Sequence, residues 1–376
     1  MKALVLDAEA RTGRVKEVPS PESAPNEVLI QVKAIALNPV DALYTAHPLG
    51  QSGRVLGSDF SGVVVALGPG VPSSSKLQVG SHVAGFLQGA CSVNDRPGAF
   101  AEYLVCPWDL VWRINDLSFE EAAAISLCAL TAAQPLFLRL GLPAPFSCQQ
   151  PIQHPAELPR SIFINGASTS VALYAAQLVR SSPNPVTLIG SASPKHFSLL
   201  SGPPYNYDHL VDYRVPQWSQ QVLMMNNNLA LDIGYDCISE GTTVLDTAKT
   251  LKRGAKMAVV RSREGEAWRT SAEELGLEPS YGAVWEGLGE DLVYAGMTLL
   301  ANPTTRAFTV SFYAWLSEGG RMVSNPVRLM PGALEKLVDD GFTLLGTGSM
   351  DDRKGEMRDE AWMRPVSGEK LVYRIS

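Results

Sequence analysis

The chain has 376 residues, enough for two domains that each bury a core. Hydrophobic residues make up 45% and charged residues 18%, as in an ordinary soluble enzyme, and a net charge of -7 without a basic block argues against nucleic-acid binding. The first residues begin a strand rather than a signal peptide, and no apolar run is long enough to span a membrane, so we expect a cytoplasmic protein.

The first 120 residues are mostly short strands separated by turns. Residues 28–37 form a β-rich run that ends at Asn38-Pro39-Val40-Asp41, where proline blocks continuation and Asn and Asp favour a turn. Further strands punctuated by glycine are predicted at 56–68, 79–86 and 98–105. At residue 118 the period changes, because Ser118 followed by Glu121 is a capping box that predicts the start of a helix.

A proline-rich stretch at 141–160 precedes the next strand. Its prolines at 143, 145, 151, 155 and 159 exclude a helix or a central strand, so we expect an extended surface connector.

Residues 161–180 predict the opening of a dinucleotide-binding βαβ unit. A short apolar strand, 161–164, leads into a polar turn, 165–170, and then into a helix with one apolar face. Such a turn holds a pyrophosphate with backbone N–H groups and the helix N-terminus. The usual glycines are replaced by A-S-T-S-V-A at 167–172, which offers hydroxyl groups at 168–170 instead. The alternative is a structural βα unit without a ligand.

The next strand, 185–190, carries the prediction about the cofactor. An enzyme that uses NAD normally places Asp or Glu at the end of this strand to bind the ribose hydroxyls. Here the chain continues Ser191-Ala192-Ser193-Pro194-Lys195-His196, with no acid and one or two cations that could pair with a 2′-phosphate. We therefore expect NADPH rather than NADH. The alternative is that Lys195 and His196 form a solvated helix start.

Two more parallel strands are predicted at 231–238 and 256–260, followed by a polar loop at 261–277. The segment 348–363 is charged and irregular, which indicates a surface excursion. The five cysteines and five histidines are scattered, without a C-x-x-C pair. This spacing fits neither a disulfide framework nor a tight zinc site.

Several motifs together resemble the medium-chain dehydrogenase/reductase superfamily. They are N-P-V-D at 38–41, L-G-S-D-F-S-G-V-V at 56–64, V-G-S-H-V-A-G-F at 79–86, G-A-F-A-E-Y at 98–103, L-S-F-E-E-A-A-A at 117–124, L-T-A at 130–132, V-D-Y-R at 211–214 and S-G-E-K-L-V at 367–372. The resemblance implies an α/β fold with a GroES-like β-rich catalytic domain and a Rossmann domain with a doubly wound parallel sheet. We expect the catalytic domain at 1–140, the connector at 141–160, the Rossmann domain at 161–300 and a return to the catalytic domain at 301–376.

Departures from the superfamily pattern indicate its zinc-independent branch of quinone and enoyl reductases. Zinc alcohol dehydrogenases carry Cys where Asn38 stands and Gly-His-Glu where Gly57-Ser58-Asp59 stands, and the four clustered cysteines of their structural zinc lobe are absent. We expect no metal site, because too few nitrogen or sulfur ligands remain.

The connector, the G-A-S-T-S turn and S-P-K-H resemble the fungal trans-acting enoyl reductases that serve polyketide synthases and their peptide-synthetase hybrids. This implies NADPH-dependent reduction of an α,β-unsaturated acyl thioester on the acyl carrier domain of such a megasynthase. Three alternatives stay open: a connector that is only a tolerated insertion, a free-standing quinone or alkenal reductase, and a non-catalytic binding module.

The resemblance implies cofactor contacts from seven segments. They are Val40, Asp41, Ala42 and Leu43; Thr131, Ala132, Ala133, Gln134, Pro135, Leu136, Phe137 and Leu138; Ser168, Thr169, Ser170 and Val171; Ser193, Pro194, Lys195 and His196; Tyr213; and Trp285, Glu286, Gly287 and Leu288 with Arg364 and Pro365.

Two hydroxyl groups are catalytic candidates. Enoyl reduction places negative charge on the thioester oxygen, and Thr131 could donate to it, unless its hydroxyl bonds back to its own helix. Some relatives carry Lys two residues after the Asp of the N-P-x-D turn, but this chain has Leu43 there, followed by Tyr44. Tyr44 could supply the proton, or it could be core while water or the ribose 2′-hydroxyl protonates the product.

Overall fold

Two compact units make up the chain in the computed structural model, which describes residues 1–91, 96–294, 297–354 and 358–375. The β-rich unit comprises Met1–Leu127 and Trp285–Ser376, and the parallel-sheet unit comprises Cys128–Val284. The β-rich unit is therefore interrupted by the parallel-sheet unit along the sequence, as in the predicted fold class.

The parallel-sheet unit is built on six strands in the order β10-β9-β8-β11-β12-β13. The strands are β8 Ser161–Asn165, β9 Thr187–Ala192, β10 His209–Asp212, β11 Leu231–Asp236, β12 Leu251–Val259 and β13 Ser280–Tyr281. Every pair is parallel. In order of appearance this is 3-2-1-4-5-6, the strand order of a Rossmann fold, so the predicted doubly wound sheet is confirmed.

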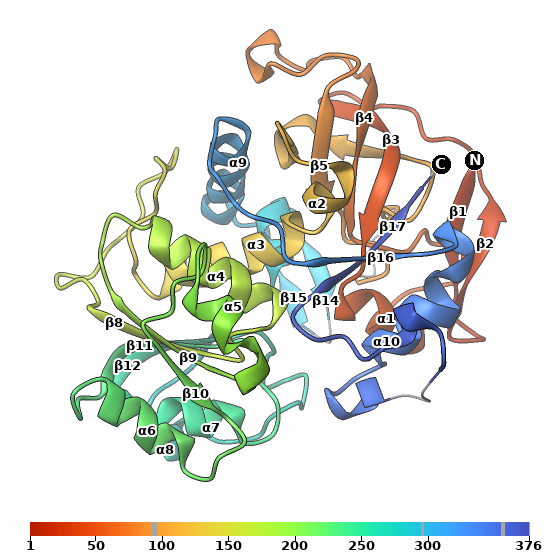
Figure 1. Ribbon diagram of the computed structural model, residues 1–376. Coiled ribbons are helices and arrows are strands. Elements are labelled where there is room, and N and C mark those ends of the chain that lie inside the picture. Colours follow the sequence, from red (N-terminus) through yellow and green to blue (C-terminus); the bar gives the residue numbers. More distant parts are fainter. Residues whose placement is uncertain (92–95, 295–296, 355–357, 376) are drawn as a thin grey trace. The chain divides into compact units, whose positions relative to one another are not determined.

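Helices cover both faces of this sheet, with α4 and α5 on one side and α6, α7 and α8 on the other (Figure 1). Their bounds are α4 Ser170–Ser181, η4 Pro194–His196, α5 Phe197–Ser201, α6 Trp218–Met225, α7 Thr243–Ala248 and α8 Ala272–Leu275. The core under α6 includes Phe163 stacked on Trp218, with ring centroids 5.4 Å apart. Helix α8 lies where a loop was predicted, and the capping box of Ser271 and Glu274 is the signal that could have located it.

The parallel-sheet unit begins and ends elsewhere than the predicted domain, which was 161–300. Helix α3, Ser126–Ala133, continues into the π-helix η3, Gln134–Arg139, and η3 packs against β12 and β13. The connector 141–160, which the structure describes throughout, contains no helix or strand. Its ends are held by the residues that follow α4, because Ser182 donates to the Pro143 carbonyl at 2.8 Å and Asn184 to the Pro159 carbonyl at 2.7 Å.

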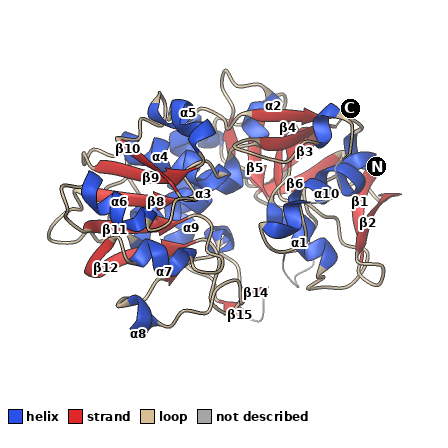
Figure 2. Ribbon diagram, turned by 60° about the horizontal axis from the view of Figure 1, so that its bottom comes forward, coloured by secondary structure: helices blue, strands red, loops and turns tan. Residues whose placement is uncertain are grey.

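The β-rich unit contains a sheet in the order β16-β17-β3-β4-β5-β7, with β6 paired to β3. Figure 2 labels β3, β4, β5 and β6 of this sheet. These strands are β3 Glu27–Ala36, β4 Asp59–Leu67, β5 His82–Phe86, β6 Tyr103–Pro107, β7 Val111–Arg113, β16 Val327–Met330 and β17 Lys370–Arg374. Two hairpins are separate from this sheet: β1 Lys2–Asp7 with β2 Thr12–Glu17, and β14 Leu292–Tyr294 with β15 Met297–Leu299. Strand β17 pairs antiparallel with β3, so the end of the chain returns to the first sheet.

The helical segments of the β-rich unit are short apart from α9. They are α1 Pro39–Ala46, η1 Ser73–Ser75, η2 Trp108–Leu110, α2 Phe119–Ala123, η5 Val284–Leu288 at the unit boundary, α9 Pro303–Ser317, η6 Ala333–Lys336, η7 Leu337–Phe342, α10 Thr343–Leu345, η8 Asp351–Lys354 and η9 Ala361–Met363. The predicted capping box opens α2, with Ser118 and Glu121 bonded reciprocally. Within the described part of the chain, no helix has the length and apolar character needed to cross a membrane.

Candidate active site

The turn between β8 and α4 is closed by its own backbone. Gly166 has φ 72°, a left-handed conformation that favours glycine, and the N–H of Thr169 donates to the Gly166 carbonyl at 2.8 Å. The Thr169 hydroxyl accepts from the N–H of Ala172 at 3.3 Å and so caps α4. Ser168, Ser170 and Val171 are half-buried beside it. The predicted phosphate turn therefore has the expected strand-turn-helix geometry, with one hydroxyl already used as a helix cap.

A buried polar network lies beneath this turn. The N–H of Gly166 donates to the Ser191 hydroxyl at 3.0 Å, and that hydroxyl donates to the side-chain oxygen of Asn165. The Asn165 amide donates to Asp236 Oδ1 at 2.9 Å, and Thr243 donates to Asp236 Oδ2 at 2.7 Å. Burial raises the pKa of Asp236, while these donors oppose the rise. The network joins the carboxyl ends of β8, β9 and β11. It also holds the turn in place through the N–H of Gly166.

At the ends of β9 and β10 the structure brings two predicted cofactor residues together. The Ser193 hydroxyl lies 3.4 Å from the Tyr213 hydroxyl, and Tyr213 is 50% exposed. Pro194 and His196 form η4 with Lys195, whose exposed side chain makes no ion pair with any other residue that the structure describes. Arg214, by contrast, is bound in bidentate fashion to Asp212 at 2.9 and 3.0 Å. Lys195 is therefore the cation at this edge whose charge no neighbouring carboxylate offsets.

The segment 131–138 lies mostly in the interior of its unit. Ala132, Ala133, Gln134, Leu136 and Phe137 are fully buried, and the Gln134 amide donates to the Val284 carbonyl at 3.4 Å. Pro135 is also buried, whereas Thr131 and Leu138 are half-buried. The Tyr235 hydroxyl donates to the Thr131 carbonyl at 2.8 Å. Burial raises the pKa of Tyr235, so its hydroxyl keeps its proton and remains a donor.

In the β-rich unit, five buried polar side chains form a second network. The Asn38 amide donates to Ser58 Oγ at 3.0 Å and to Asp59 Oδ2 at 2.8 Å, and its oxygen accepts from Lys370. Asp41 accepts from the Asn38 N–H at 2.7 Å and from Ser58 Oγ at 2.9 Å. Lys370 Nζ lies 3.3 Å from Asp59 Oδ2, with both side chains at most 3% exposed. The network joins the ends of β3, β4 and β17.

Charge in this second network is unbalanced when both carboxylates are ionised, because Lys370 is its one cation. Burial raises the pKa of Asp41 to about 7, although the hydrogen bonds from Asn38 and Ser58 oppose the rise. Burial also raises the pKa of Asp59, and the Lys370 ammonium opposes that rise. The carboxyl group of Asp41 is thus buried within the β-rich unit. Asp41 was predicted from its turn motif, whereas the parts played by Ser58, Asp59 and Lys370 were not predicted from the sequence.

The other predicted residues of α1 divide between core and partial exposure. Val40 and Leu43 are half-buried, and the Val40 carbonyl accepts from Cys91 Sγ at 3.9 Å. Ala42 and Tyr44 are buried, at 2% and 8% exposure. Tyr44 as proton donor stays a prediction.

The last predicted segments also lie in the β-rich unit. Trp285 is buried with its ring centroid 5.8 Å from that of Phe86, Gly287 and Leu288 are buried, and Glu286 is half-buried. Arg364 is exposed and pairs with Glu369 at 2.8 Å. Its carbonyl and that of Pro365 accept from the buried guanidinium of Arg328 at 2.6 and 3.1 Å, which fixes this backbone.

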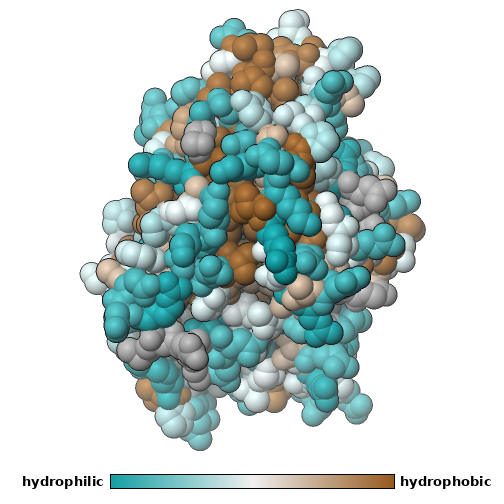
Figure 3. Space-filling model, turned by 90° about the vertical axis from the view of Figure 1, so that its right-hand side faces the viewer, coloured by the Kyte–Doolittle hydropathy of each residue, from teal (hydrophilic) through white to brown (hydrophobic). Residues whose placement is uncertain are grey.

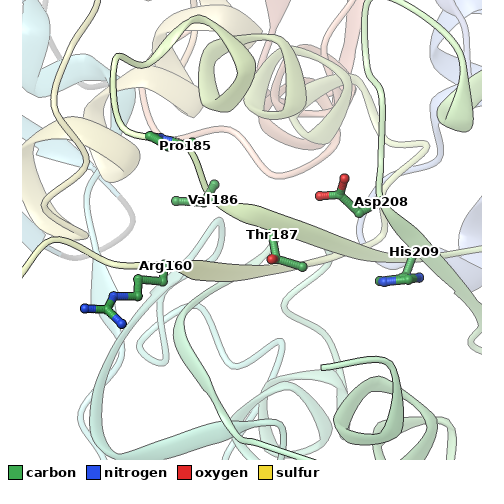
Figure 4. Close-up of a pocket in the computed structure, with 6 residues that line it drawn as sticks. All are labelled: Arg160, Pro185, Val186, Thr187, Asp208 and His209. Atoms are coloured by element: carbon green, nitrogen blue, oxygen red, sulfur yellow. The ribbon is translucent and has the colours of Figure 1, made fainter. Parts of the chain in front are cut away.

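None of the predicted site residues lines either of two shallow pockets. The first lies at the amino ends of β8, β9 and β10, the edge opposite to the one where Rossmann folds bind dinucleotides. Arg160, Pro185, Val186, Thr187, Asp208 and His209 line it (Figure 4). The second, on the β-rich unit, includes Leu4, Val15, Leu334 and Val338. Hydrophobic side chains gather in a hollow on the side of the molecule where the termini lie (Figure 3).

Among residues 1–91, 96–294, 297–354 and 358–375, no three His, Cys, Asp or Glu side chains group closely enough to hold a metal ion. At Asn38 and Asp59, where zinc alcohol dehydrogenases carry ligands, the ammonium of Lys370 is bound instead.

Comparison with known proteins decides the family. The alcohol dehydrogenase GroES-like domain family matches residues 24–116. The trans-enoyl reductase ACTTS2 of Alternaria alternata is 34% identical over 380 residues, a match that covers 100% of this chain and 98% of the relative. The chain belongs to the trans-enoyl reductase family of the medium-chain dehydrogenase/reductases. It is therefore an oxidoreductase.

Solved structures support the fold of this trans-enoyl reductase family member. CurK enoyl reductase superposes with a TM-score of 0.71 at 15% identity and covers 99% of this chain and 98% of its own. The mycobacterial protein Rv1454c, solved in complex with NADPH, gives a TM-score of 0.68 at 19% identity, with both chains covered completely.

The buried network of this reductase makes Lys370 critical for stability. We predict that Lys370→Met lowers the free energy of unfolding by about 3–5 kcal/mol, because two carboxylates then stay buried without a cation. Urea denaturation measures the loss. The control is Lys76→Met, since Lys76 pairs with Glu318 at 3.4 Å with both side chains more than 60% exposed. That change should cost less than about 1 kcal/mol, and equal losses would contradict the assignment.

The raised pKa of Asp41 predicts a pH-dependent stability. Between its ordinary pKa of 3.8 and its folded pKa of about 7, the folded state binds a proton that the unfolded state has released. The contribution of Asp41 to stability is therefore fully present only below pH 3.8 and is lost as the pH rises through about 7. Asp41→Asn should flatten this decline in denaturation curves, while the exposed Asp116→Asn should not. An unchanged slope in Asp41→Asn would show that Asp41 is ionised throughout.

Proposed function

We propose that this chain is an NADPH-dependent trans-acting enoyl reductase. Its substrate would be an α,β-unsaturated acyl thioester carried on the acyl carrier domain of a polyketide synthase or of a polyketide synthase–peptide synthetase megasynthase. The observation that carries the proposal is the match to ACTTS2, because it covers 100% of this chain and 98% of the relative rather than the nucleotide-binding part alone. Because both units of the chain match the relative, we assign the activity of the relative to this chain.

The cofactor proposal is supported by the edge at which β8, β9 and β10 end. The closed turn at Gly166 and the start of α4 would hold the pyrophosphate, with Ser168 and Ser170 beside it. Strand β9 leads to Ser193 and Lys195 rather than to an acid, and Tyr213 stands beside Ser193. A 2′-phosphate would find a cation and two hydroxyl groups there, which favours NADPH over NADH.

The bound nicotinamide supplies the hydride that reduces the β-carbon of the substrate. The residues of the chain would stabilise the charge that develops on the thioester oxygen and deliver a proton to the α-carbon. Thr131 is our candidate for the first task, because it carries a hydroxyl on a half-buried side chain between the apolar residues Leu130 and Ala132 of α3. Tyr44, or else water or the ribose 2′-hydroxyl, would carry out the second.

The proposed substrate can be tested against the free-standing alternatives. NADPH oxidation is followed with an enoyl chain on an acyl carrier domain, with the same chain on a short free thioester, and with simple quinones. We expect the carrier-bound chain to give the highest kcat/KM. Fast quinone reduction with negligible turnover of acyl thioesters would replace the proposal with a quinone reductase, and failure to bind NADPH in a fluorescence titration would leave a non-catalytic module.

The cofactor preference is tested at Lys195. Lys195→Ala should weaken NADPH binding by about 10-fold or more and leave NADH binding almost unchanged, because only NADPH carries the 2′-phosphate that the ammonium would pair with. Fluorescence titration gives both dissociation constants. The control Lys249→Ala removes an exposed cation from the end of α7, where it pairs with Asp246, and should change neither constant. Equal weakening of both cofactors by Lys195→Ala would refute the phosphate contact.

A further inference from the structure

Strand β2 is an edge strand, because it pairs with β1 on one side and with no described strand on the other. Leu4 lies opposite Val15 in this antiparallel pair, and Leu6 lies opposite Gly13. The N–H groups of Leu4 and Leu6 each donate at 2.8 Å to a backbone carbonyl on the side of β1 that faces away from β2. Residues directly opposite each other in an antiparallel pair bond either inward or outward together. The N–H and C=O groups of Gly13 and Val15 therefore point to the open edge of β2.

A hollow of about 290 Å³ lies between this edge and the helical segments η6 and η7. Its apolar lining comes from both sides and consists of Leu4, Val15, Leu334 and Val338. Leu4 and Leu334 are buried, whereas Val15 and Val338 are half-buried. Figure 3 shows hydrophobic atoms with a hydrophilic rim in a hollow on this side of the molecule. A strand added to β2 could place an apolar side chain in this space.

The rim of the hollow is acidic. Glu335 and Asp339 both border it. Glu335 pairs with Lys2 at 3.1 Å, with the two side chains 51% and 52% exposed. Asp339 is exposed and forms no ion pair with another residue in the described part of the chain. An acidic side chain that entered the hollow would be repelled by this carboxylate, so the hollow favours an uncharged side chain.

The opposite face of β2 is basic. Successive side chains of a strand point to opposite faces, so Arg14 and Lys16 lie on the face away from Val15 and the hollow. Arg14 contacts Asp7 at 3.1 Å, with its own side chain 61% exposed. Lys16 is exposed, and none of the residues that the structure describes forms an ion pair with it. Acidic side chains of an added strand would face two exposed cations here.

These cations disfavour a second copy of the chain as the added strand. If two β2 strands paired antiparallel through Val15, either with Val15 or with Gly13 of the other copy, Arg14 would lie opposite Lys16 or Arg14. Like charges directly opposite each other destabilise a strand pair. The edge is therefore suited to a different chain, in which acidic residues alternate with apolar ones.

We propose that the open edge of β2 is a docking site for an extended acidic segment of the partner synthase, which adds to the sheet as a third strand. The acidic side chains of this segment face Arg14 and Lys16, and an apolar side chain between them enters the hollow beside Val15. The inference rests on the proposed function for the identity of the partner, because an enzyme that acts in trans has to be held to the protein that carries its substrate. The chemistry of the segment follows from β2 itself.

Peptide binding to the full-length protein tests the edge. A labelled peptide with the core Val-Glu-Leu-Glu-Val, followed by fluorescence anisotropy, should bind at least about 10-fold more tightly than one with the core Val-Lys-Leu-Lys-Val. Arg14→Glu/Lys16→Glu should reverse this preference. Failure of both peptides to bind, or the same preference in the double variant, would overturn the proposal. The two cations would then serve only to protect an edge strand from aggregation.

Backbone pairing is tested separately at Val15. Val15→Pro removes an N–H that points outward, so the ladder to β1 is kept, and proline is tolerated in edge strands. This change should weaken binding of the acidic peptide about 10-fold or more, whereas the control Val15→Thr, which keeps the N–H, should weaken it less than about threefold. Equal binding by the proline variant and the wild-type protein would contradict strand addition. If the proline variant folds poorly, the charge-reversal variant still decides the proposal.

Activity assays separate this proposal from the proposed function. With NADPH and the intact synthase, Arg14→Glu/Lys16→Glu should lower the rate of enoyl reduction about 10-fold and leave reduction of a short free thioester unchanged. An unchanged rate with the synthase would overturn the docking site. If the wild-type protein reduces neither substrate, the proposed function fails, while the peptide experiment still decides what the edge binds. A wild-type dimer in sedimentation that the double variant abolishes would assign the edge to a second copy instead.

Discussion

The ammonium of Lys370 is the charge on which the organisation of the β-rich unit depends. It is buried with the carboxylate of Asp59 and the amide of Asn38, and these residues come from β17, β4 and the end of β3. A charge in a dry interior must be paired and hydrogen-bonded, or the fold loses several kcal/mol. The last strand, β17, is therefore most stable beside β3, where Lys370 reaches the turn at residues 38–41.

In the parallel-sheet unit, buried polar groups are also hydrogen-bonded to one another, but fewer of them are charged. The carboxyl ends of β8, β9 and β11 are joined through Asn165, Ser191 and Asp236, and the first N–H of the cofactor turn donates into this network. The turn can thus keep its shape with one glycine at Gly166 and hydroxyl-bearing residues after it. In both units a polar network at strand ends shapes the neighbouring segment that we propose to act in binding or catalysis.

Much of the fold could be predicted because its signals are local. The strand-turn-helix at 161–180 and the capping box at Ser118 each depend on neighbouring residues, and the motifs occur in the order of a known superfamily. The parallel-sheet unit starts at Cys128 rather than at the predicted 161, because its extent depends on how η3 packs against strands that follow it by more than a hundred residues. Helix α8 was not predicted, although the capping box at Ser271 is a local signal for it.

Some residues of the candidate site could be predicted from local sequence, and others could not. Lys195 could be named from its place after a predicted strand, and Asp41 from a turn motif. The cation of its network could not, because Lys370 meets Asn38 across 332 positions of sequence. Nor does local sequence show that the Thr131 carbonyl accepts from a tyrosine in β11. Spacing along the chain reveals which groups are present, whereas their pairing depends on the sheet topology.

We propose that this reductase delivers hydride to the β-carbon of a carrier-bound enoyl thioester. A single turnover with NADPH that carries deuterium at C4 of the nicotinamide, followed by mass spectrometry of the released acyl chain, tests it directly. The account predicts a saturated chain with one deuterium at the β-carbon when the transferred face is labelled and none when the other face is labelled. An unsaturated chain, or a saturated chain without deuterium from either label, would contradict it.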